Sequence, residues 1–296
     1  MSIRAFRTLV AIARHGTFAR AGDAIGLTQS AVSLHVKALE TEFSVQLFDR
    51  SRRQPTLTEA GRIVLAQAEQ ILAMVDGIPD ALSDEKQLVG RLRVGAIQTA
   101  LSGPMPNALL SLRVAHPSLR VHVAAGLSLS LALAQRVAGG ELDAAVTTHP
   151  VRPHPSGLVW QTLYEHRYWL VAPPRHEGWS VRELLEALPF IRFDAQAWAG
   201  REIAAELRRM GIKVREEMVL DSAETIVHMA SRGLGAGVVA LHDSVLARLP
   251  PVVRLPFGQP QLRSAVVLLE HRSRPAQRFA QALAAELIAS SMRFSH

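Results

Sequence analysis

Two short helices joined by a glycine turn constrain this chain more than any other feature of its sequence. Thr17 is a favoured N-cap residue for a helix from Phe18 to about Ile25. Thr28 caps a second helix that runs to about Phe43, and Gly26-Leu27 lies between the two. This arrangement predicts a helix-turn-helix.

An amphipathic helix precedes this pair of helices. Apolar residues recur there at helical spacing, and His15-Gly16 ends the segment. The helix that begins after Thr28 has its own apolar stripe, which predicts a small three-helix core. The apolar positions of the two segments are Ile3, Phe6, Val10 and Ala13, and Val32, Val36, Leu39 and Phe43.

The exposed face of the last of these helices is predicted to contact nucleic acid. Its small and polar side chains suit base edges and phosphates in a major groove. Residues 47–58 then predict a wing, in which two short extended segments flank a basic tip that binds phosphate. The predicted DNA-binding residues are Thr28, Gln29, Ser30, Ser33, His35, Lys37, Arg50, Arg52 and Arg53.

The distribution of charge supports a polyanionic partner. The whole chain has a net charge of +7, and residues 1–58 contain eight Lys or Arg against four Asp or Glu, a net charge of +4. Basic clustering of this kind is typical of nucleic-acid binding. A solvated basic surface, or a helical module for protein contacts, is the alternative that charge alone leaves open.

The first sixty residues resemble the LysR-type transcriptional regulators of bacteria. Gly22, where the family usually has alanine, and Ser44, where it usually has glycine, depart from the family pattern and put the local geometry there in doubt. The resemblance is dense only in this region and extends to the rest of the chain as a pattern of elements. The matching residues are Phe6, Val10-Ala11, His15-Gly16-Thr17-Phe18, Ala21, Leu27-Thr28-Gln29-Ser30-Ala31-Val32-Ser33, Leu39-Glu40, Leu47-Phe48, Arg50, Leu57-Thr58 and Ala60-Gly61.

A long helix that begins after Thr58 is predicted to pair two copies of the chain. Its apolar residues alternate in steps of four and three, which is the spacing of a coiled-coil seam. The resemblance also implies that this helix is the dimerisation element, whereas the alternative is a helix lying on its own domain. Pro79 is expected to kink or break it. The seam consists of Val64, Ala68, Ile71, Val75, Ile78 and Leu82.

The remaining two hundred residues alternate between predicted strands and helices, which indicates an α/β fold. The segment 149–155, rich in proline and histidine, is expected to separate two lobes. The resemblance implies a type 2, periplasmic-binding-protein-like effector domain. The predicted limits are 1–58 for the winged helix-turn-helix, 59–89 for the linker helix and hinge, and 90–296 for the effector domain. Lobe 1 takes about 91–160 plus 268–296, and lobe 2 about 161–267.

Hydroxyl groups recur where the predicted strands of this domain end. In open α/β sheets a ligand binds beyond the carboxyl ends of strands, beside helix N-termini. A small organic effector, with a carboxylate favoured, would suit this lining, although helix capping explains any one hydroxyl taken alone better than a ligand does. The predicted effector-binding residues are Thr99, Ser102, Ser128, Thr147, Thr148, Phe193 and Trp198.

The sequence offers little for catalysis, and we expect no enzyme, no cofactor and no metal site. There is no cysteine and no G-x-S-x-G motif. His149 and His154 flank prolines in the expected interlobe segment, and His176-Glu177 lacks the second histidine of a zinc helix. Gly233-Leu234-Gly235-Ala236-Gly237 precedes a strand and lacks the spacing of a dinucleotide loop. No apolar run approaches the length of a membrane span.

These observations predict a cytoplasmic, sequence-specific transcription regulator that responds to a small effector. Its expected partners are promoter DNA, the effector, a second copy in a homodimer or homotetramer, and RNA polymerase, with no membrane contact. An enzyme on a binding-protein-like fold with a DNA-binding appendage is one alternative. A constitutive DNA-organising protein is another.

Overall fold

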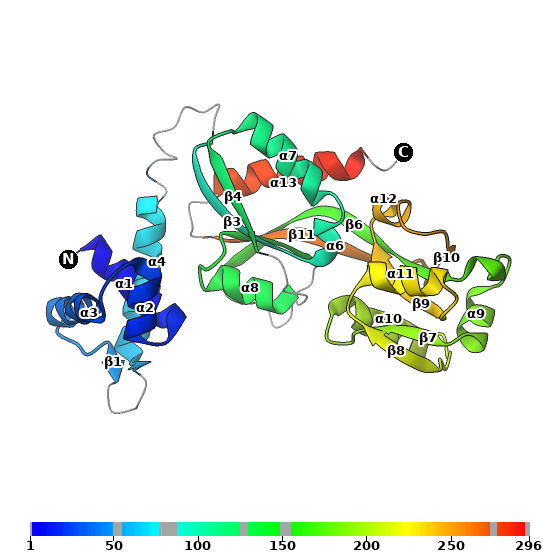
Figure 1. Ribbon diagram of the computed structural model, residues 1–296, viewed down its shortest axis with the longest axis horizontal. Helices are drawn as coiled ribbons and strands as arrows, with labels where there is room; N and C mark the ends of the chain where they lie inside the picture. Colours follow the sequence, from blue (N-terminus) through cyan, green and yellow to red (C-terminus); the bar gives the residue numbers. More distant parts are fainter. Residues whose placement is uncertain are drawn as a thin grey trace. The chain divides into compact units, whose positions relative to one another are not determined.

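The computed structural model describes residues 2–49, 55–76, 78, 88–124, 130–148, 155–272 and 277–293. The chain divides into two compact units (Figure 1). We call the described residues up to 78 the N-terminal unit and those from 88 onward the C-terminal unit.

The N-terminal unit is a three-helix core with a wing and a long fourth helix. The predicted helices are confirmed, and Ser2, Thr17 and Thr28 each accept a backbone N–H as the N-cap residue of one of them. Gly16 and Gly26 end the first two with φ of 75° and 69°, which glycine adopts without a Cβ penalty. The elements are α1 (Ile3–His15), α2 (Phe18–Ile25), α3 (Gln29–Phe43), β1 (Phe48–Asp49), β2 (Thr56–Leu57) and α4 (Glu59–Asp76).

Gly22 and Ser44, the two departures from the family pattern, each occupy a position with a specific backbone constraint. A Cβ added to Gly22 would lie 2.5 Å from the carbonyl oxygen of Leu27, so the turn is packed more tightly than an alanine allows. Ser44 ends α3 with φ of 53°, a left-handed conformation that glycine adopts more easily. The helix-turn-helix nevertheless forms around both residues.

The C-terminal unit is built on one sheet that runs through two lobes. In the described part of the chain its order is β4-β3-β5-β11-β6-β9-β7-β8, with β10 on β6. The pairs β3–β4, β3–β5, β7–β8 and β7–β9 are parallel, which confirms the alternation within each lobe. The strands are β3 (Gly90–Ala96), β4 (Leu119–Ala124), β5 (Ala144–Thr148), β6 (Leu158–Ala172), β7 (Phe190–Phe193), β8 (Glu216–Leu220), β9 (Ala236–Leu241), β10 (Val253–Pro256) and β11 (Arg263–His271).

Helices cover the sheet in both lobes. Figure 1 shows α7 and α13 side by side on one face of the first lobe and α8 on the other. Because β11 pairs with β5 and α13 packs on α7, the end of the chain completes the first lobe. The helices are α6 (Gln98–Leu101), α7 (Met105–Ala115), α8 (Ser130–Ala138), α9 (Val181–Ala187), α10 (Trp198–Arg209), α11 (Ala223–Ser231), α12 (Asp243–Leu246) and α13 (Gln277–Met292), with a 3-10 turn at Pro174–His176.

The two strands β6 and β11 join the lobes. They are antiparallel to each other and to their other neighbours, β9 and β5 (Figure 1). The sequence predicted a strand only near Tyr168–Ala172, but β6 begins ten residues earlier, at Leu158. The sequence also missed β10, α6 and α12, which are each four residues long.

Each lobe has its own hydrophobic core. Leu92, Val146 and Leu283 are fully buried in the first, and Phe190 and Ile226 in the second. Burying a side chain of this size stabilises a fold by about 1.5–3 kcal/mol. Two separate cores therefore let the lobes act as two bodies with a cleft between them.

Candidate functional site

The exposed face of α3 is the first candidate site. Gln29, Ser30, Ser33 and Lys37 are exposed, while Val32, Val36 and Leu39 on the opposite face are buried in the core. Thr28 is exposed, and its Oγ1 accepts a hydrogen bond of 3.3 Å from the backbone N–H of Ala31. The structure therefore brings five of the six predicted helix residues to one accessible surface.

His35 lies at the edge of this face and turns towards α1. Its Nδ1 is 2.8 Å from Oγ1 of the buried residue Thr8. The Thr8 hydroxyl donates its proton to the carbonyl oxygen of Arg4, so it accepts from His35 Nδ1–H. The Nδ1 edge of the imidazole therefore points towards the core, and His35 is half-buried, whereas the sequence predicted an exposed position.

Leu34 is a surface residue that the sequence reasoning missed. Its side chain is 66% exposed, next to the exposed residues Ser30, Ser33 and Lys37 on the helix surface. Leu34 lies one helical turn after Ser30 and is therefore on the same side of α3. The sequence analysis predicted only polar residues as DNA contacts.

A buried carboxylate joins the wing to α3. Glu40 Oε1 accepts hydrogen bonds from the backbone N–H groups of Leu47 at 2.9 Å and Phe48 at 3.4 Å. The strands β1 and β2 then pair through Phe48 and Leu57, and the ring of Phe48 packs on Phe18 at 5.4 Å. The wing strands are therefore held against the helix-turn-helix, while the predicted tip residues Arg50, Arg52 and Arg53 lie outside the described residues.

The predicted seam on α4 packs partly on its own unit. Ala68 is buried in the N-terminal core, and Val64 and Ile71 pack against the same core. Ile78, beyond α4, is 52% exposed. These contacts are those of a helix lying on its own domain, and pairing of two chains stays a prediction. Leu82 and Pro79 lie outside the described residues.

A cleft between the lobes of the C-terminal unit is the second candidate site. Its cavity volume is about 70 Å³. It contains four of the predicted effector-binding residues, namely Thr99, Thr148, Phe193 and Trp198, but neither Ser102 nor Thr147 lines it. Ser128 lies outside the described residues. The full lining is Ile97, Gln98, Thr99, Ser130, Thr148, His166, Tyr168, Phe193, Ala197, Trp198, Ala199, Asp221, Ser222, Ala223, Glu224, Ala240 and Ser264.

Polar residues from three separate elements meet in this cleft. His166 and Tyr168 project from β6, Ser264 from β11, and Glu224 from the first turn of α11. No sequence motif connects them. Pairing of β6 with β11 brings His166, Tyr168 and Ser264 together, and packing of α11 against β6 adds Glu224. None of the four was predicted from the sequence as an effector-binding residue.

Several polar atoms of the cleft have no partner within the described part of the chain. His166 Nε2, Trp198 Nε1 and Glu224 Oε1 are buried and make no hydrogen bond there. Such atoms cost free energy unless a water or a ligand satisfies them. Burial, together with the nearby His242, lowers the pKa of His166 to about 3 and keeps its imidazole neutral. The indole N–H of Trp198 is also an uncharged group.

The phenol of Tyr168 is also fixed. It donates a hydrogen bond to the carboxylate of Glu202, and burial together with the charge of Glu202 raises the Tyr168 pKa well above its usual range. The cleft therefore holds a protonated phenol and a neutral imidazole two residues apart on the same strand.

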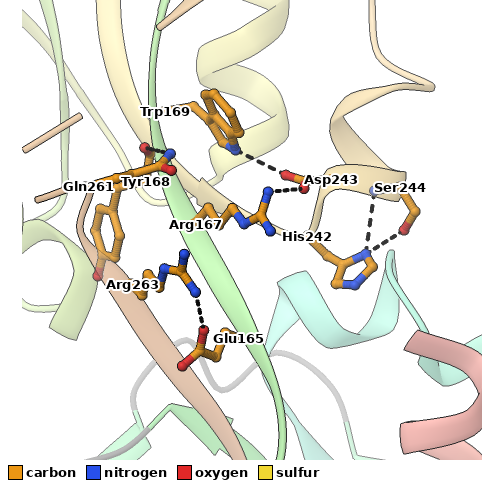
Figure 2. A network of polar contacts seen from close by, with 9 residues as sticks. All are labelled: Glu165, Arg167, Tyr168, Trp169, His242, Asp243, Ser244, Gln261 and Arg263. Carbon is orange, nitrogen blue, oxygen red and sulfur yellow. Dashed lines mark hydrogen bonds and ion pairs between the residues drawn. The ribbon is translucent and has the colours of Figure 1, made fainter. Parts of the chain in front are cut away.

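Ion pairs occupy the opposite face of these strands. Figure 2 shows Arg167 and Trp169 both pointing at Asp243, with distances of 3.1 and 3.2 Å, while Arg263 pairs with Glu165 at 3.1 Å. Because side chains alternate along a strand, the neighbours His166 and Tyr168 face the cleft. The polar network fixes β6 against β11 and α12 without entering the cleft.

Comparisons with known proteins match both units. A family model described as a bacterial regulatory helix-turn-helix protein of the lysR family matches residues 3–62. A second, described as the LysR substrate binding domain, matches residues 85–291.

Two similar proteins match most of the chain. A probable RuBisCO transcriptional regulator of Cyanophora paradoxa is 33% identical over 252 residues, covering 81% of this chain and 76% of that protein. Another from Cyanidium caldarium is 34% identical over 248 residues, covering 79% and 76%.

Solved structures share the fold. Full-length OxyR from Pseudomonas aeruginosa has a TM-score of 0.72 at 23% identity, covering 97% of this chain and 94% of its own. Full-length CbnR in complex with its target DNA has a TM-score of 0.54 at 18% identity, covering 97% and 100%.

A winged helix-turn-helix joined to a two-lobed substrate-binding domain defines a DNA-binding transcription regulator. The chain belongs to the LysR family of these regulators. Within the ranges that the structure describes, no helix is long and apolar enough to cross a membrane.

Proposed function

We propose that this regulator reads a specific operator with α3 and its wing, and changes its action on DNA when a small organic effector occupies the interlobe cleft. The observation that supports the effector most directly is the set of buried, unpartnered polar atoms at His166, Trp198 and Glu224. The proposed division of labour follows the predicted limits: 1–58 binds DNA, 59–89 assembles the oligomer, and 90–296 senses the effector.

The lining favours an effector with a carboxylate. The N-terminus of α10 opens on the cleft at Trp198 and Ala199, and no side chain in the part of the chain that the structure describes caps it. The N–H groups of a first helical turn, with the positive end of the helix dipole, bind carboxylates well. The described lining residues include no Lys or Arg and two acids, Asp221 and Glu224. The carboxylate would therefore be bound by N–H and O–H donors at the start of α10 and at the Thr99 hydroxyl.

The same lining favours a hydrogen-bond donor elsewhere on the effector. Within the described residues, Glu224 Oε1 is a buried acceptor that makes no hydrogen bond, and His166 Nε2 is a second buried polar atom that makes none. A hydroxyl or amino group on the effector would satisfy them. We therefore propose a small hydroxy or amino acid.

Calorimetry on the full chain tests the effector site. We expect Thr99→Val to weaken binding of small hydroxy and amino acids by about 1–3 kcal/mol. Ser102→Ala is the matched control, because this hydroxyl, at the other end of α6, donates to the carbonyl oxygen of Gln98 and does not line the cleft. Equal effects of both changes would place the effector elsewhere.

Genome-wide mapping of binding sites tests the DNA function. RuBisCO promoters are the first targets to check, because the relatives in Cyanophora and Cyanidium are named as probable RuBisCO regulators. We expect Gln29→Ala to weaken specific binding by about 1–3 kcal/mol and to leave binding to random DNA unchanged. Equal loss on both would contradict α3 as the reading helix.

We propose a homodimer or homotetramer that contacts RNA polymerase at the promoter and acts in the cytoplasm. A purified sample that turned over a candidate effector would instead support the enzyme alternative, so the calorimetric samples are also assayed for product.

A further inference from the structure

The exposed surface of α3 contains one large apolar side chain. Leu34 is 66% exposed, while Ser30, Ser33 and Lys37 around it are polar and exposed. Among the described residues, Leu34 is not one of those that pack against the core of the N-terminal unit. In the described residues the core beneath α3 is filled by Val32, Val36 and Leu39 instead.

The neighbours of Leu34 along the same side of α3 have shorter side chains than leucine. Ser30 lies one turn before it and Ala38 one turn after it on the same stripe of the helix. Both side chains are short, so the leucine methyl groups stand further from the helix axis than their neighbours along that stripe. Leu34 is therefore the side chain of this stripe that penetrates a groove most deeply.

The major groove offers one apolar partner of the right size. Among the base edges there, only thymine presents a methyl group, at C5, and the other groups are donors and acceptors. A leucine against any of those groups would bury them without a hydrogen bond. We propose that Leu34 contacts a thymine C5-methyl group in each half-site of the operator and so determines the base at that position.

This inference rests on the proposed reading role of α3. It adds an apolar contact to the polar ones predicted at Gln29 and Ser33. Gln29→Ala separates the two claims, because it tests the helix while leaving Leu34 in place. If neither Gln29→Ala nor Leu34→Ala changed operator binding, the reading role of α3 would fail, and the contact with it.

The test uses the full chain and an operator selected from a pool of random DNA. Thymine is replaced by deoxyuridine, which lacks the C5-methyl, at one position of the half-site at a time. At the contacted position we expect wild-type affinity to fall about fourfold, which corresponds to one methyl group removed from the interface. For Leu34→Ala we expect about five- to thirtyfold weaker binding to the thymine operator and no further loss with deoxyuridine at that position.

Two further variants separate recognition from folding. Leu34→Met keeps a flexible apolar side chain and should retain sensitivity to deoxyuridine at the same position. Leu234→Ala is the matched truncation of an exposed leucine in the C-terminal unit, 45% exposed, and should leave DNA binding unchanged. The proposal is overturned if the selected half-site contains no thymine, or if Leu34→Ala stays as sensitive to deoxyuridine as the wild type at every position. It is equally overturned if Gln29→Ala weakens binding but Leu34→Ala does not.

Discussion

The guanidinium of Arg248 donates a hydrogen bond of 3.1 Å to the backbone carbonyl oxygen of Ser102, and this bond links lobe 2 to lobe 1. Arg248 follows α12 and also donates from Nε to the carbonyl oxygen of Ser244, which holds it in place. Ser102 follows α6, whose first turn lines the cleft. The bond therefore forms beside the proposed effector site and depends on the angle between the lobes.

Removing this bond should favour the open arrangement of the lobes. We expect Arg248→Ala to weaken effector binding by about 1 kcal/mol, the usual net value of one hydrogen bond, and to leave effector-free DNA binding nearly unchanged. Calorimetry on the full chain measures the effect. Arg136→Ala, which removes a surface ion pair with Glu141 inside lobe 1, is the control and should do nothing. Unchanged effector affinity in Arg248→Ala would show that the bond does not report lobe closure.

Loss of the Glu40 carboxylate should loosen the wing. Glu40→Ala leaves the N–H groups of Leu47 and Phe48 without their acceptor in a buried place, and we expect a loss of stability of about 2 kcal/mol. Hydrogen exchange at these two amides of the full chain should accelerate. Glu40→Gln keeps an acceptor oxygen and should have a smaller effect, while Glu42→Ala, on the exposed side of α3, serves as the surface control. Slow exchange at both amides in Glu40→Ala would rule out the carboxylate as their anchor.

Stability should fall as the pH is lowered because of His166. Burial holds its folded-state pKa at about 3, against an ordinary value of 6.5. The unfolded chain takes up this proton first, so the folded state loses stability as the pH falls from about 6.5 towards 3. Between pH 7 and pH 5 this amounts to roughly 2 kcal/mol from this residue.

Urea unfolding at the two pH values measures the effect. His166→Gln should flatten the dependence, whereas His15→Gln, at an exposed histidine, should not. His242 contributes in the same direction, since burial lowers its pKa too, so the variant should reduce the slope without abolishing it. An unaltered slope in His166→Gln would mean that its imidazole is protonated in the folded chain.

Assembly through the predicted seam should depend on its exposed end. Val64, Ala68 and Ile71 pack on the core of their own unit, so a charge there would disturb folding. Ile78 is 52% exposed, and we expect Ile78→Asp to place an unpaired charge in the interface and to give monomers in sedimentation. Ile63→Asp is the control, because Ile63 is 58% exposed but lies off the seam. Dimers that survive Ile78→Asp and dissociate with Ile63→Asp would move the interface to the other face of α4.

Local signals made the N-terminal unit predictable. Thr17 and Thr28 cap helices at the positions that the sequence indicated, because an N-cap depends on residues within one turn. In α9, Ser180 and Glu183 form a capping box, a local signal of the same kind that the sequence analysis did not use. The start of β6 was missed because polar residues such as Gln161 and Glu165 interrupt its apolar pattern, although strand pairing on both sides satisfies the backbone.

The cleft was predictable only in part. Thr99 and Trp198 belong to turns after strands, where the chemistry of a helix N-terminus points to a ligand. His166, Ser264 and Glu224 come from strands and a helix that only the sheet order brings together. Leu34 was not predicted for a different reason: an exposed leucine has no hydrogen-bonding group, whereas most base edges in the major groove are donors and acceptors.

The shared strands β6 and β11 limit how the lobes can respond to an effector. Their register shifts between Val266 and Val267, so that β6 has one additional residue there, and such a bulge locally increases the twist. Because both lobes are built on the same hydrogen-bonded pair, one lobe can turn about this point but cannot translate away from the other without breaking backbone bonds. Labels placed on different lobes should therefore report a change of angle on effector binding, whereas distances within each lobe stay constant.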